Sequence, residues 1–594
     1  MCGIFGYYNL SNEHKKLSNS ILHEMANTIN HRGPDGNGYF HDENVGFALG
    51  NVRLAILDLE HGQQPIYSDD KKIIVVQNGE IFNFIELRSE LESKGINFKT
   101  NCDTEVILRI YESDGINGLK KLNGMFAIAI YDYNNETFYL IKDRVGEKPL
   151  YYYKDNNRII FASEIKSILK AIPKPSINFL ALEEYFSFNY VPHPNTLFQN
   201  IYNLAPGHYL AISEGSISQH CWWDLSQVNS VVRSEDEYIK EFNELLEDAT
   251  RIRLYSDVPF GAFLSGGVDS STVVGLMSKL MDKPVKTYSI GFEDPRFDES
   301  IYAQEASQRF STDHTLEIVN PDMLELWPTV IYHCDQPHGD ASFMPTYKVA
   351  QLASEHVKMV LTGDGADELF AGYDKYLNYF NKNNEKELTS EEFIQSYSSN
   401  ISLFKESELK QLFAPQVFDK ISKSALSTRV KDLIDNVPHM DRINQALYID
   451  TMLLLSGNNL VKPDRMGMAS SIENRAPFLD YRVIEFAFGL PGSVKLHNHE
   501  TKYIYKKAVE PLIGKNLTYR KKQMFTVPVG EWFKSHLQDL CKDLLLSPRT
   551  KSRQLFDYDY IQSLYTEHCN NVKDNTRQLR ALMSFEYWCR TFLD

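Results

Sequence analysis

The amino-acid sequence predicts two domains of different fold class. The first is an α+β domain with sheets packed face to face and helices outside, and the second is an α/β domain with a parallel sheet and a helical C-terminal part. The chain has 594 residues, well above the ~100–200 residues of one ordinary domain. Short strand-like runs fill its first third, whereas strand and helix patterns alternate in its middle. These three observations together carry the prediction.

Strand-like runs in the first third are rich in β-branched and aromatic residues and are bounded by Asn, Asp and Gly, as is typical of sheets. The expected strands are Lys72–Gln77, Met125–Tyr133, Thr137–Ile141 and Ile159–Ala162. Helical patterns cover Asn83–Lys94 and Thr104–Glu112. We therefore expect the first domain to occupy residues 2–207.

Several prolines and Gly207 precede a polar stretch, which predicts a linker at residues 208–235 and a second domain at residues 236–594. The expected elements are helix Glu235–Arg253, strand Val258–Leu264, helix Ser270–Leu280 and strands Val285–Ile290 and Lys358–Leu361. This alternation predicts a parallel sheet that binds ligands at the carboxyl ends of its strands. After Gly372 the pattern is mainly helical.

Composition excludes several classes of function. Hydrophobic residues make up 43% of the chain and charged residues 24%, as in ordinary soluble globular proteins. The net charge of −17 disfavours binding to nucleic acid and to acidic membranes. No uncharged apolar run is long enough to cross a bilayer. The seven cysteines show no CxxC spacing, which favours a reducing compartment, and we expect a cytoplasmic protein.

Cys2 is a candidate nucleophile because it becomes the first residue once Met1 is removed. A free α-amino group has a pKa of ~7.7–8.0 and can serve as a base near neutral pH. Nucleophile and base then belong to one residue, which is one form of covalent catalysis. By itself, a cysteine at position 2 is better explained as accidental.

Other motifs in the first third provide matching chemistry. Arg53, at an expected strand end, can bind a carboxylate through two parallel hydrogen bonds. Asn78 and Gly79 could form an oxyanion hole for a tetrahedral amide intermediate, following the strand that ends near Val76. Asp103 precedes a helix and could equally be a helix N-cap.

These motifs, together with residues 143–152 (DRVGEKPLYY) and 161–164 (FASE), resemble a class II glutamine amidotransferase domain. The resemblance implies an N-terminal-nucleophile hydrolase fold, an αββα sandwich, with Cys2 as the nucleophile. It also implies that Asn78 and Gly79 form the oxyanion hole. The implied glutamine-binding residues are Arg53, Asn78, Glu80 and Asp103.

The segment Leu264–Ser271 (LSGGVDSS) lies between an expected strand and an expected helix. Glycines let the backbone approach an anion, and a helix N-terminus supplies free N–H groups. The segment is not the usual GxxxxGK[ST] phosphate loop because the lysine is missing. A tight turn capped by Asp269 or Ser270 is the alternative explanation. The segment resembles the pyrophosphate-binding loop of ATP pyrophosphatases.

A second segment, Leu361–Glu368 (LTGDGADE), repeats this strand–turn–helix pattern with three acidic residues. Acidic residues beside a polyphosphate predict Mg²⁺, held by carboxylates and phosphates, and we expect Asp269 and Asp367 to bind it. Acidic residues also favour helix N-termini, so a solvated helix start remains the alternative.

The whole arrangement resembles the synthetase domain of glutamine-hydrolysing asparagine synthetases. Further matching segments are 289–292 (SIGF), Asp298, 461–466 (VKPDRM), 472–480 (IENRAPFLD) and 520–525 (RKKQMF). The implied ATP-binding residues are Leu264, Ser265, Gly266, Gly267, Asp269, Ser270, Ile290, Thr362 and Gly363. The resemblance implies that Lys522 and Asp364 act in acyl-adenylate formation, that ammonia passes through an interdomain tunnel, and that the chain could form a homodimer.

We therefore expect an asparagine synthetase that uses glutamine, ATP and aspartate. Departures from the family pattern at Asp364, Pro463 and Met524, and a long stretch at Tyr373–Asn436, leave the acceptor open. The main alternative is a glutamine-dependent amidotransferase acting on a uronic-acid sugar or a cell-wall carboxylate. Phosphoribosyl amidotransferases are disfavoured because they lack the loop at Ser265. A β-lactam synthetase would not need a nucleophilic cysteine, and a non-enzymatic regulator predicts no glutaminase activity.

Overall fold

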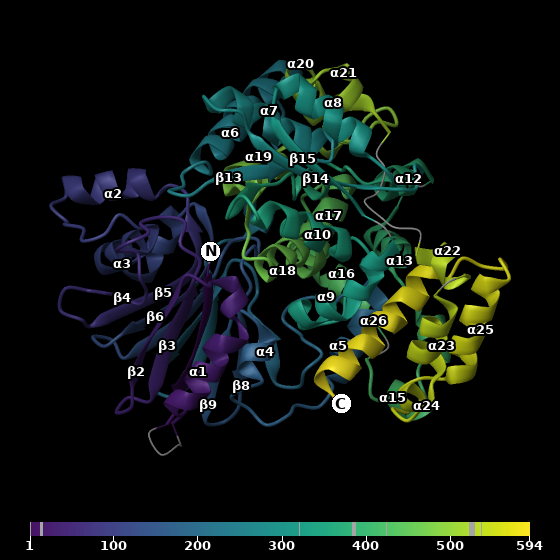
Figure 1. The fold of residues 1–594 in the computed structure, drawn as a ribbon, viewed down its shortest axis with the longest axis horizontal. Helices are drawn as coiled ribbons and strands as arrows, with labels where there is room; N and C mark the ends of the chain where they lie inside the picture. The colour runs from purple at the N-terminus through teal and green to yellow at the C-terminus, as the bar shows by residue number, and fades with distance from the viewer. Residues whose placement is uncertain are drawn as a thin grey trace.

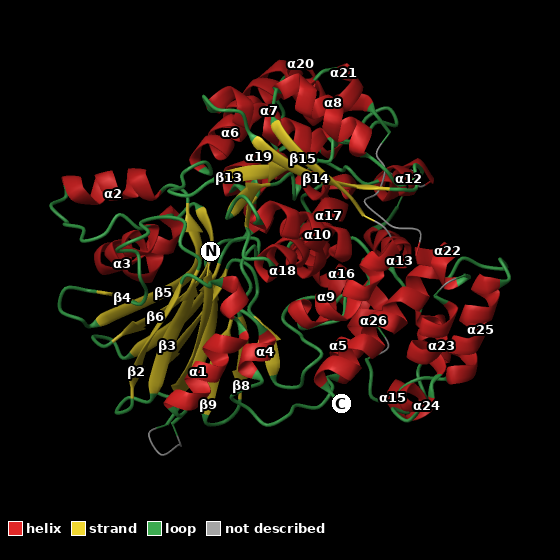
Figure 2. Ribbon diagram, in the orientation of Figure 1, coloured by secondary structure: helices red, strands yellow, loops and turns green. Residues whose placement is uncertain are grey.

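The computed structural model describes residues 2–11, 16–319, 321–382, 388–422, 424–521, 529–535 and 537–594. Lys522 and Met524, on which predictions were made above, lie outside the described residues. The N-terminal part contains two antiparallel sheets stacked face to face (Figure 1, Figure 2). The sheets meet in a core that includes Ile4 and Tyr8 on one side and Ile74 and Val76 on the other.

The two sheets have six strands each. The first has the order β10 (Ile201–Asn203), β8 (Tyr151–Lys154), β9 (Arg158–Ala162), β1 (Cys2–Asn9), β3 (Phe47–Arg53) and β2 (Gly36–Asp42). The second has the order β12 (Ser216–Cys221), β11 (His208–Ser213), β7 (Thr137–Lys142), β6 (Gly124–Asp132), β5 (Ile73–Ile81) and β4 (Ile66–Tyr67).

Strand alternation sends every second side chain to the outer face of each sheet, where helices cover it. Tyr7 of β1 packs with α1 (Asn19–Thr28) and α4 (Ile165–Ile168), and Val75 of β5 packs with α2 (Phe84–Ser93) and α3 (Asp103–Asp114). The predicted αββα sandwich is therefore confirmed.

The boundary of this domain lies later than the sequence analysis placed it. Residues 208–221, expected in the linker, form β11 and β12 of the second sheet. Leu210 and Ile212 of β11 are buried in the core between the sheets. Gly207, whose φ is 67°, makes a turn inside the domain rather than ending it. The linker therefore begins after β12.

The second domain contains a five-stranded parallel sheet, as predicted. Its order is β15 (Asp313–Val319), β14 (Lys286–Phe292), β13 (Phe260–Phe263), β16 (Met359–Leu361) and β17 (Glu473–Arg475). After β13 the chain adds β14 and then β15 on one side of it, and later adds β16 on the other side of β13. The strand order thus reverses between β13 and β16, which is where open parallel sheets bind ligands.

Helices cover both faces of this sheet and build the rest of the domain (Figure 2). Those nearest the sheet are α6 (Glu235–Ile252), α7 (Val268–Leu280), α8 (Ser300–Phe310), α9 (Trp327–Cys334), α10 (Phe343–Ser354), α11 (Ala366–Leu369), α18 (Val461–Ala469), α19 (Tyr481–Gly489), α20 (Tyr503–Ile513) and α21 (Lys515–Tyr519).

The remaining helices lie in the C-terminal half of the chain, except α5, which precedes the parallel sheet in sequence and packs against α16. They are α5 (Phe179–Phe188), α12 (Asp374–Lys382), α13 (Ser390–Ile401), α14 (Glu406–Leu412), α15 (Pro415–Phe418), α16 (Ala425–Asn436), α17 (Arg442–Ile449), the π-helical η5 (Asp450–Asn459), α22 (Val529–Phe533), α23 (Gln538–Leu546), α24 (Pro548–Lys551), α25 (Tyr558–Cys569) and α26 (Thr576–Phe592). Short 3₁₀ turns are η1 (Asn30–Arg32), η2 (Gly115–Lys121), η3 (Leu225–Gln227), η4 (Pro321–Leu326), η6 (Pro477–Leu479) and η7 (Gly492–Val494).

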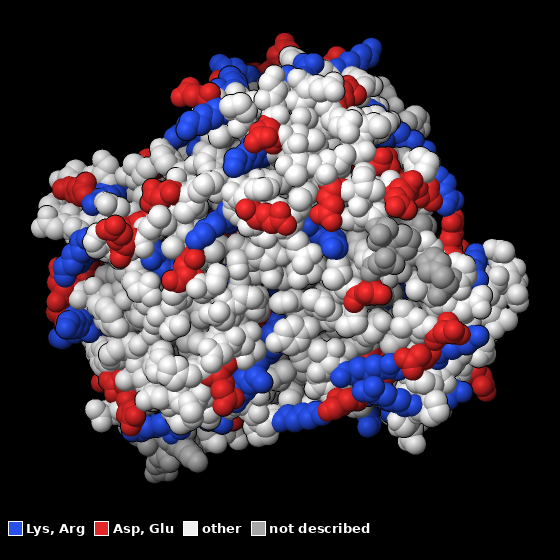
Figure 3. All heavy atoms as spheres, viewed as in Figure 1, with Lys and Arg blue, Asp and Glu red and all other residues white. Residues whose placement is uncertain are grey.

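Basic and acidic side chains lie interspersed over the face drawn in Figure 3. Within the described part of the chain, no helix has the length and apolar character that crossing a bilayer requires. The seven cysteines form no disulfide.

Candidate active sites

The first candidate site lies where β1 begins, at the edge of the sandwich next to the second domain. Cys2 is 6% exposed, and the register of β1 and β3 places it directly opposite Arg53. Its backbone N–H donates to Asn78 Oδ1 of the facing sheet at 3.2 Å. Strand register and sheet stacking thus bring together three residues that lie far apart in sequence.

Asn78 and Gly79 lie within β5, which continues to Ile81 rather than ending near Val76 as predicted. Gly79 has a φ of 151°, and a Cβ there would lie 2.0 Å from the Met125 carbonyl oxygen of β6. Only glycine fits this close approach. The Asn78 amide donates from Nδ2 to Ser163 Oγ at 3.3 Å, which fixes its orientation beside Cys2.

Arg53 directs its guanidinium at the loop after β3. It donates to the carbonyls of Leu57 (2.9 Å), Asp58 (2.7 Å) and Leu59 (3.2 Å). No carboxylate side chain pairs with it among the described residues. Its charge is therefore held in place by carbonyls but not neutralised, which suits it to an anionic ligand group.

Asp103 and Glu80 form a buried acidic pair near the end of β5. Asp103 Oδ2 accepts from the Ile81 N–H at 2.9 Å and from Gln77 Nε2 at 3.1 Å, so it holds this strand rather than capping its own helix. Burial raises the pKa of Asp103. Burial also raises the pKa of Glu80, and the nearby Asp103 carboxylate raises it further. Two buried carboxylates side by side favour a cationic ligand group.

The second candidate site lies at the reversal point of the parallel sheet. The loop after β13 carries Ser265 to Gly267, and the loop after β16 carries Thr362 to Gly365. These loops touch, because a Cβ on Gly363 would lie 2.7 Å from the Cβ of Asp269. The predicted ATP-binding residues therefore gather at one edge of the sheet.

Side-chain hydroxyls and an arginine fix the backbone conformation of the first of these loops. Ser270 Oγ accepts from the Ser265 N–H at 3.2 Å, and Arg520 Nε donates to the Gly266 carbonyl at 2.8 Å. Gly266 has a φ of 68°, which suits glycine. The helix α7 begins here, and the N–H groups of its first turn have no partner inside the helix. Leu264 and Ile290 lie buried at the ends of the neighbouring strands.

Lys502 is a residue of this site to which the sequence analysis assigned no role. Its ammonium lies 2.7 Å from Asp269 Oδ1 and 2.7 Å from Asp367 Oδ1, and its side chain is 3% exposed. The two predicted metal-binding carboxylates therefore converge on one cation. Among the described residues no group of three His, Cys, Asp or Glu could hold a metal alone, so Mg²⁺ fits here only with phosphate oxygens as further ligands. No sequence pattern marks Lys502.

Asp364 lies at the same edge, and its Oδ2 accepts from Thr362 Oγ1 at 2.7 Å. Burial raises the pKa of Asp364, while Lys462 lowers it. Lys522, predicted to act beside it, lies outside the described residues.

A narrow cavity of ≈20 Å³ lies between the two sites. Glu147 and Lys148 of the first domain line it on one side, and Asp364 and Asp464 are among its residues from the second domain. A space of this volume holds about one water-sized molecule. The complete lining is Glu147, Lys148, Thr362, Asp364, Leu460, Pro463, Asp464, Asn474, Ala476 and Leu479.

Buried ion pairs join the domains around this cavity. Arg32 Nη1 and Nη2 donate to Asp464 at 2.9 and 3.0 Å, and Arg32 Nε donates to the Cys2 carbonyl at 3.1 Å. Arg465 and Arg32 both pair with Glu164, at 2.8 and 3.0 Å. No role was predicted for Asp464 from the sequence. The signal that could have found it is the run of charged residues Lys462, Asp464 and Arg465 in one helix.

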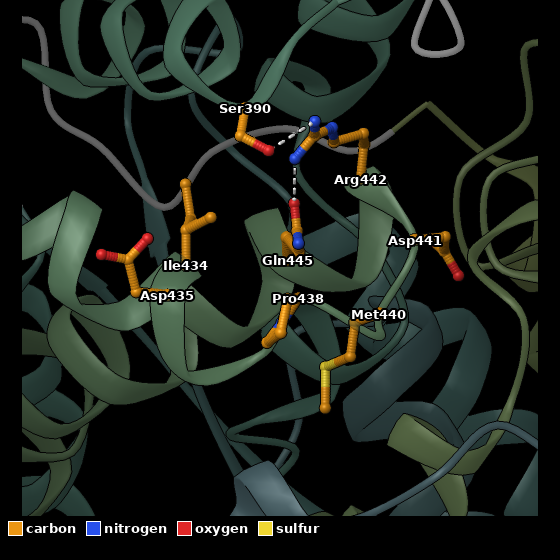
Figure 4. Close-up of a pocket in the computed structure, with 8 residues that line it drawn as sticks. All are labelled: Ser390, Ile434, Asp435, Pro438, Met440, Asp441, Arg442 and Gln445. Atoms are coloured by element: carbon orange, nitrogen blue, oxygen red, sulfur yellow. Dashed lines mark hydrogen bonds between the residues drawn. The ribbon is translucent and has the colours of Figure 1, made fainter.

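A larger cavity of ≈560 Å³ lies elsewhere, among α13, α16 and α17 (Figure 4). Arg442 spans its wall by donating to Gln445 Oε1 at 2.7 Å and to Ser390 Oγ at 3.2 Å. The other lining residues are Ile434, Asp435, Pro438, Met440 and Asp441. None of the predicted site residues lines it, so we place the chemistry at the two sites above.

The fold and the two sites define a glutamine amidotransferase joined to an ATP-dependent synthetase. Comparison with known families supports each half: residues 1–223 match the glutamine amidotransferase domain, and residues 241–590 match asparagine synthase. The chain belongs to the glutamine-hydrolysing asparagine synthetase family.

Individual relatives are similar over nearly the whole chain. Asparagine synthetase [glutamine-hydrolyzing] 1 of Bacillus subtilis is 34% identical over 99% of this chain and 96% of its own. Asparagine synthetase [glutamine-hydrolyzing] 3 of the same organism is 29% identical over 90% of each chain. Among solved structures, glutamine phosphoribosylpyrophosphate amidotransferase from B. subtilis is 17% identical with a TM-score of 0.29, covering 53% of this chain and 65% of that chain.

Proposed function

We propose that the protein makes asparagine from aspartate, glutamine and ATP in the cytoplasm, with Mg²⁺ as cofactor. The observation that carries the proposal is the cavity lined by Lys148 and Asp364, which lies between a cysteine site and a polyphosphate-type site. A cavity of this volume can hold one ammonia molecule, the one small product that the first site would supply to the second.

In the first site, Cys2 passes its thiol proton to its own free α-amino group, and its thiolate attacks the amide carbon of glutamine. The C–N bond then breaks, and the nitrogen takes up that proton and leaves as ammonia. Asn78 Nδ2 and the Gly79 N–H are the donors available to the oxyanion of the tetrahedral intermediate. Arg53 binds the glutamine carboxylate, and water then hydrolyses the thioester to release glutamate.

In the second site, the side-chain carboxylate of aspartate attacks the α-phosphorus of ATP, and pyrophosphate leaves. The N–H groups at the start of α7 hold the phosphates. Ammonia then attacks the acyl carbon, and AMP leaves. Asp269 and Asp367 would hold Mg²⁺, which when bound supplies positive charge against the phosphates.

A Cys2→Ala variant tests the division of labour. We expect it to form no glutamate from glutamine but to make asparagine from ammonia, aspartate and ATP at the wild-type rate, because the second site is untouched. Cys221→Ala, which changes an exposed cysteine, is the matched control and should behave as wild type. Loss of ammonia-dependent synthesis in the Cys2→Ala variant would contradict separate sites.

The acceptor is tested by ATP–pyrophosphate exchange with aspartate, glucuronate and galacturonate. Exchange that depends on aspartate supports the proposal. Exchange only with a uronic acid would replace aspartate by a sugar acceptor and leave the glutaminase half intact.

A further inference from the structure

An arginine of the second domain reaches into the glutamine site of the first. Arg475, on β17, donates from Nη2 to Glu80 Oε2 at 3.0 Å. Arg475 has no exposed surface, and Glu80 is 4% exposed. Since β17 belongs to the parallel sheet of the synthetase, this ion pair joins the two catalytic halves directly.

The synthetase domain fixes the position of this arginine. Its Nη1 donates to the carbonyls of Arg253 at 3.0 Å and Tyr255 at 2.8 Å, and its Nε donates to Glu473 Oε1 at 2.6 Å. All three guanidinium nitrogens therefore have partners, and only Nη2 points at the glutaminase domain. A planar guanidinium with hydrogen bonds at all three nitrogens has little freedom to rotate, so the direction of Nη2 toward Glu80 is fixed.

The pKa of Glu80 lies well above its ordinary value, and Arg475 opposes this rise. Burial raises the pKa of Glu80, and Asp103 and Glu473 raise it further, whereas Arg475 lowers it. The second carboxylate oxygen of Glu80, Oε1, is buried and accepts no hydrogen bond from the described residues. A buried acceptor without a donor is costly, and an N–H group of a ligand would remove that cost.

We propose that Arg475 is a positioning residue of the glutamine site: it fixes the orientation of Glu80, whose free oxygen receives the α-ammonium of glutamine. The inference rests on the proposed function in taking glutamine as the ligand. It adds that the glutaminase site is completed by a residue of the synthetase domain.

The same residue also touches the adenylation site. The Arg475 carbonyl accepts from the Thr362 N–H at 2.9 Å, and Thr362 binds the Asp364 carboxylate through its hydroxyl. Strand β17 thus contacts the glutamine site through the Arg475 side chain and the adenylation loop through the Arg475 carbonyl.

Arg475→Met tests the proposal, with glutamine and 4-carbamoylbutanoate as paired substrates. The second compound is glutamine without its α-amino group, so the ratio of the two kcat/KM values reports recognition of the ammonium. We expect this ratio to fall at least about tenfold in Arg475→Met, because a charge-assisted contact is lost. Glutamate release is measured without acceptor or ATP, so the result does not depend on which carboxylate is amidated.

Arg253→Met is the matched control. Arg253 is also buried at the interface and lies 4.2 Å over the Phe82 ring, as Arg475 lies 5.5 Å from it, but its charge pairs with Asp480 at 2.9 Å. In Arg253→Met, the ratio of kcat/KM for glutamine to kcat/KM for 4-carbamoylbutanoate should stay within about twofold of wild type. An equal fall in both variants would show a general loosening of the interface and overturn the proposal.

Arg475→Lys provides a second variant that keeps the positive charge. We expect it to recover part of the discrimination lost in Arg475→Met, since a lysine ammonium can still donate a hydrogen bond to Glu80. If Arg475→Met discriminates as wild type does, or if Arg475→Lys recovers nothing, Arg475 does not position Glu80. Failure of asparagine synthesis in the wild-type enzyme would instead count against the proposed function, and the substrate ratio would still be measurable.

Discussion

Replacing Asp464 by asparagine removes the charge that ties Arg32 to the synthetase domain. Asp464 receives two hydrogen bonds from Arg32, at 2.9 and 3.0 Å, and lies 3.7 Å from Lys148. The side chains of Arg32 and Asp464 are 0% and 4% exposed. Water therefore cannot replace the lost carboxylate, and Asp464→Asn leaves a buried guanidinium with one partner fewer.

Removing one partner of a buried ion pair costs roughly 3–5 kcal/mol, because the other charge stays buried without compensation. Arg32 keeps Glu164 at 3.0 Å, and asparagine preserves the volume and one acceptor oxygen. We therefore expect the lower end, a loss of ~3 kcal/mol in the free energy of unfolding at pH 7.

The pH dependence gives an independent check with a defined sign. Burial raises the pKa of Asp464, but Arg32 and Lys148 outweigh burial, so its folded pKa lies below the ordinary value. A depressed folded pKa stabilises the protein above the unfolded pKa of about 3.9, and this contribution disappears as the pH falls through the folded pKa. Wild type and Asp464→Asn should therefore converge in stability in strong acid.

Urea denaturation followed by tryptophan fluorescence measures this difference. Glu90→Gln is the control, because Glu90 pairs with Lys94 at 2.6 Å on the surface, where such pairs contribute about 0–1 kcal/mol. The reasoning is wrong if Asp464→Asn loses no more stability at pH 7 than Glu90→Gln does. It is also wrong if the gap between Asp464→Asn and wild type is unchanged in acid.

Two further predictions concern the separate sites. Lys502→Met removes the ammonium between Asp269 and Asp367, so we expect ATP–pyrophosphate exchange to fall at least about tenfold while glutaminase activity stays at the wild-type level. Unchanged exchange would exclude Lys502 from the site. Gly79→Ala places a methyl group 2.0 Å from the Met125 carbonyl oxygen, so we expect glutamate release to be lost while ammonia-dependent synthesis remains. Normal glutamate release in that variant would show that β5 and β6 can separate.

The sandwich and the parallel sheet could both be predicted from local pattern. Continuous apolar runs along β5 and β6 and the alternating strand and helix patterns after residue 235 reflect contacts within a few residues. The loops at Ser265 and Thr362 were readable through their resemblance to a known phosphate-binding loop, because glycines between a strand and a helix also mark ordinary turns. The domain boundary was misplaced because Gly207 and its prolines signal a turn, and a turn inside a sheet looks the same in sequence as the end of a domain.

The sequence by itself predicted the two chemistries: Cys2 with Asn78 and Gly79 for an amide, and the glycine-rich loop at Ser265 for a polyphosphate. Only the tertiary structure decided how they are joined. Lys502 reaches Asp269, and Arg475 reaches Glu80, across more than two hundred residues of chain. Such pairs leave no local pattern, because an ion pair depends on distance in space and on burial from water. Glu80 was predicted only as a ligand of glutamine, and in the structure it also joins the two domains through its ion pair with Arg475.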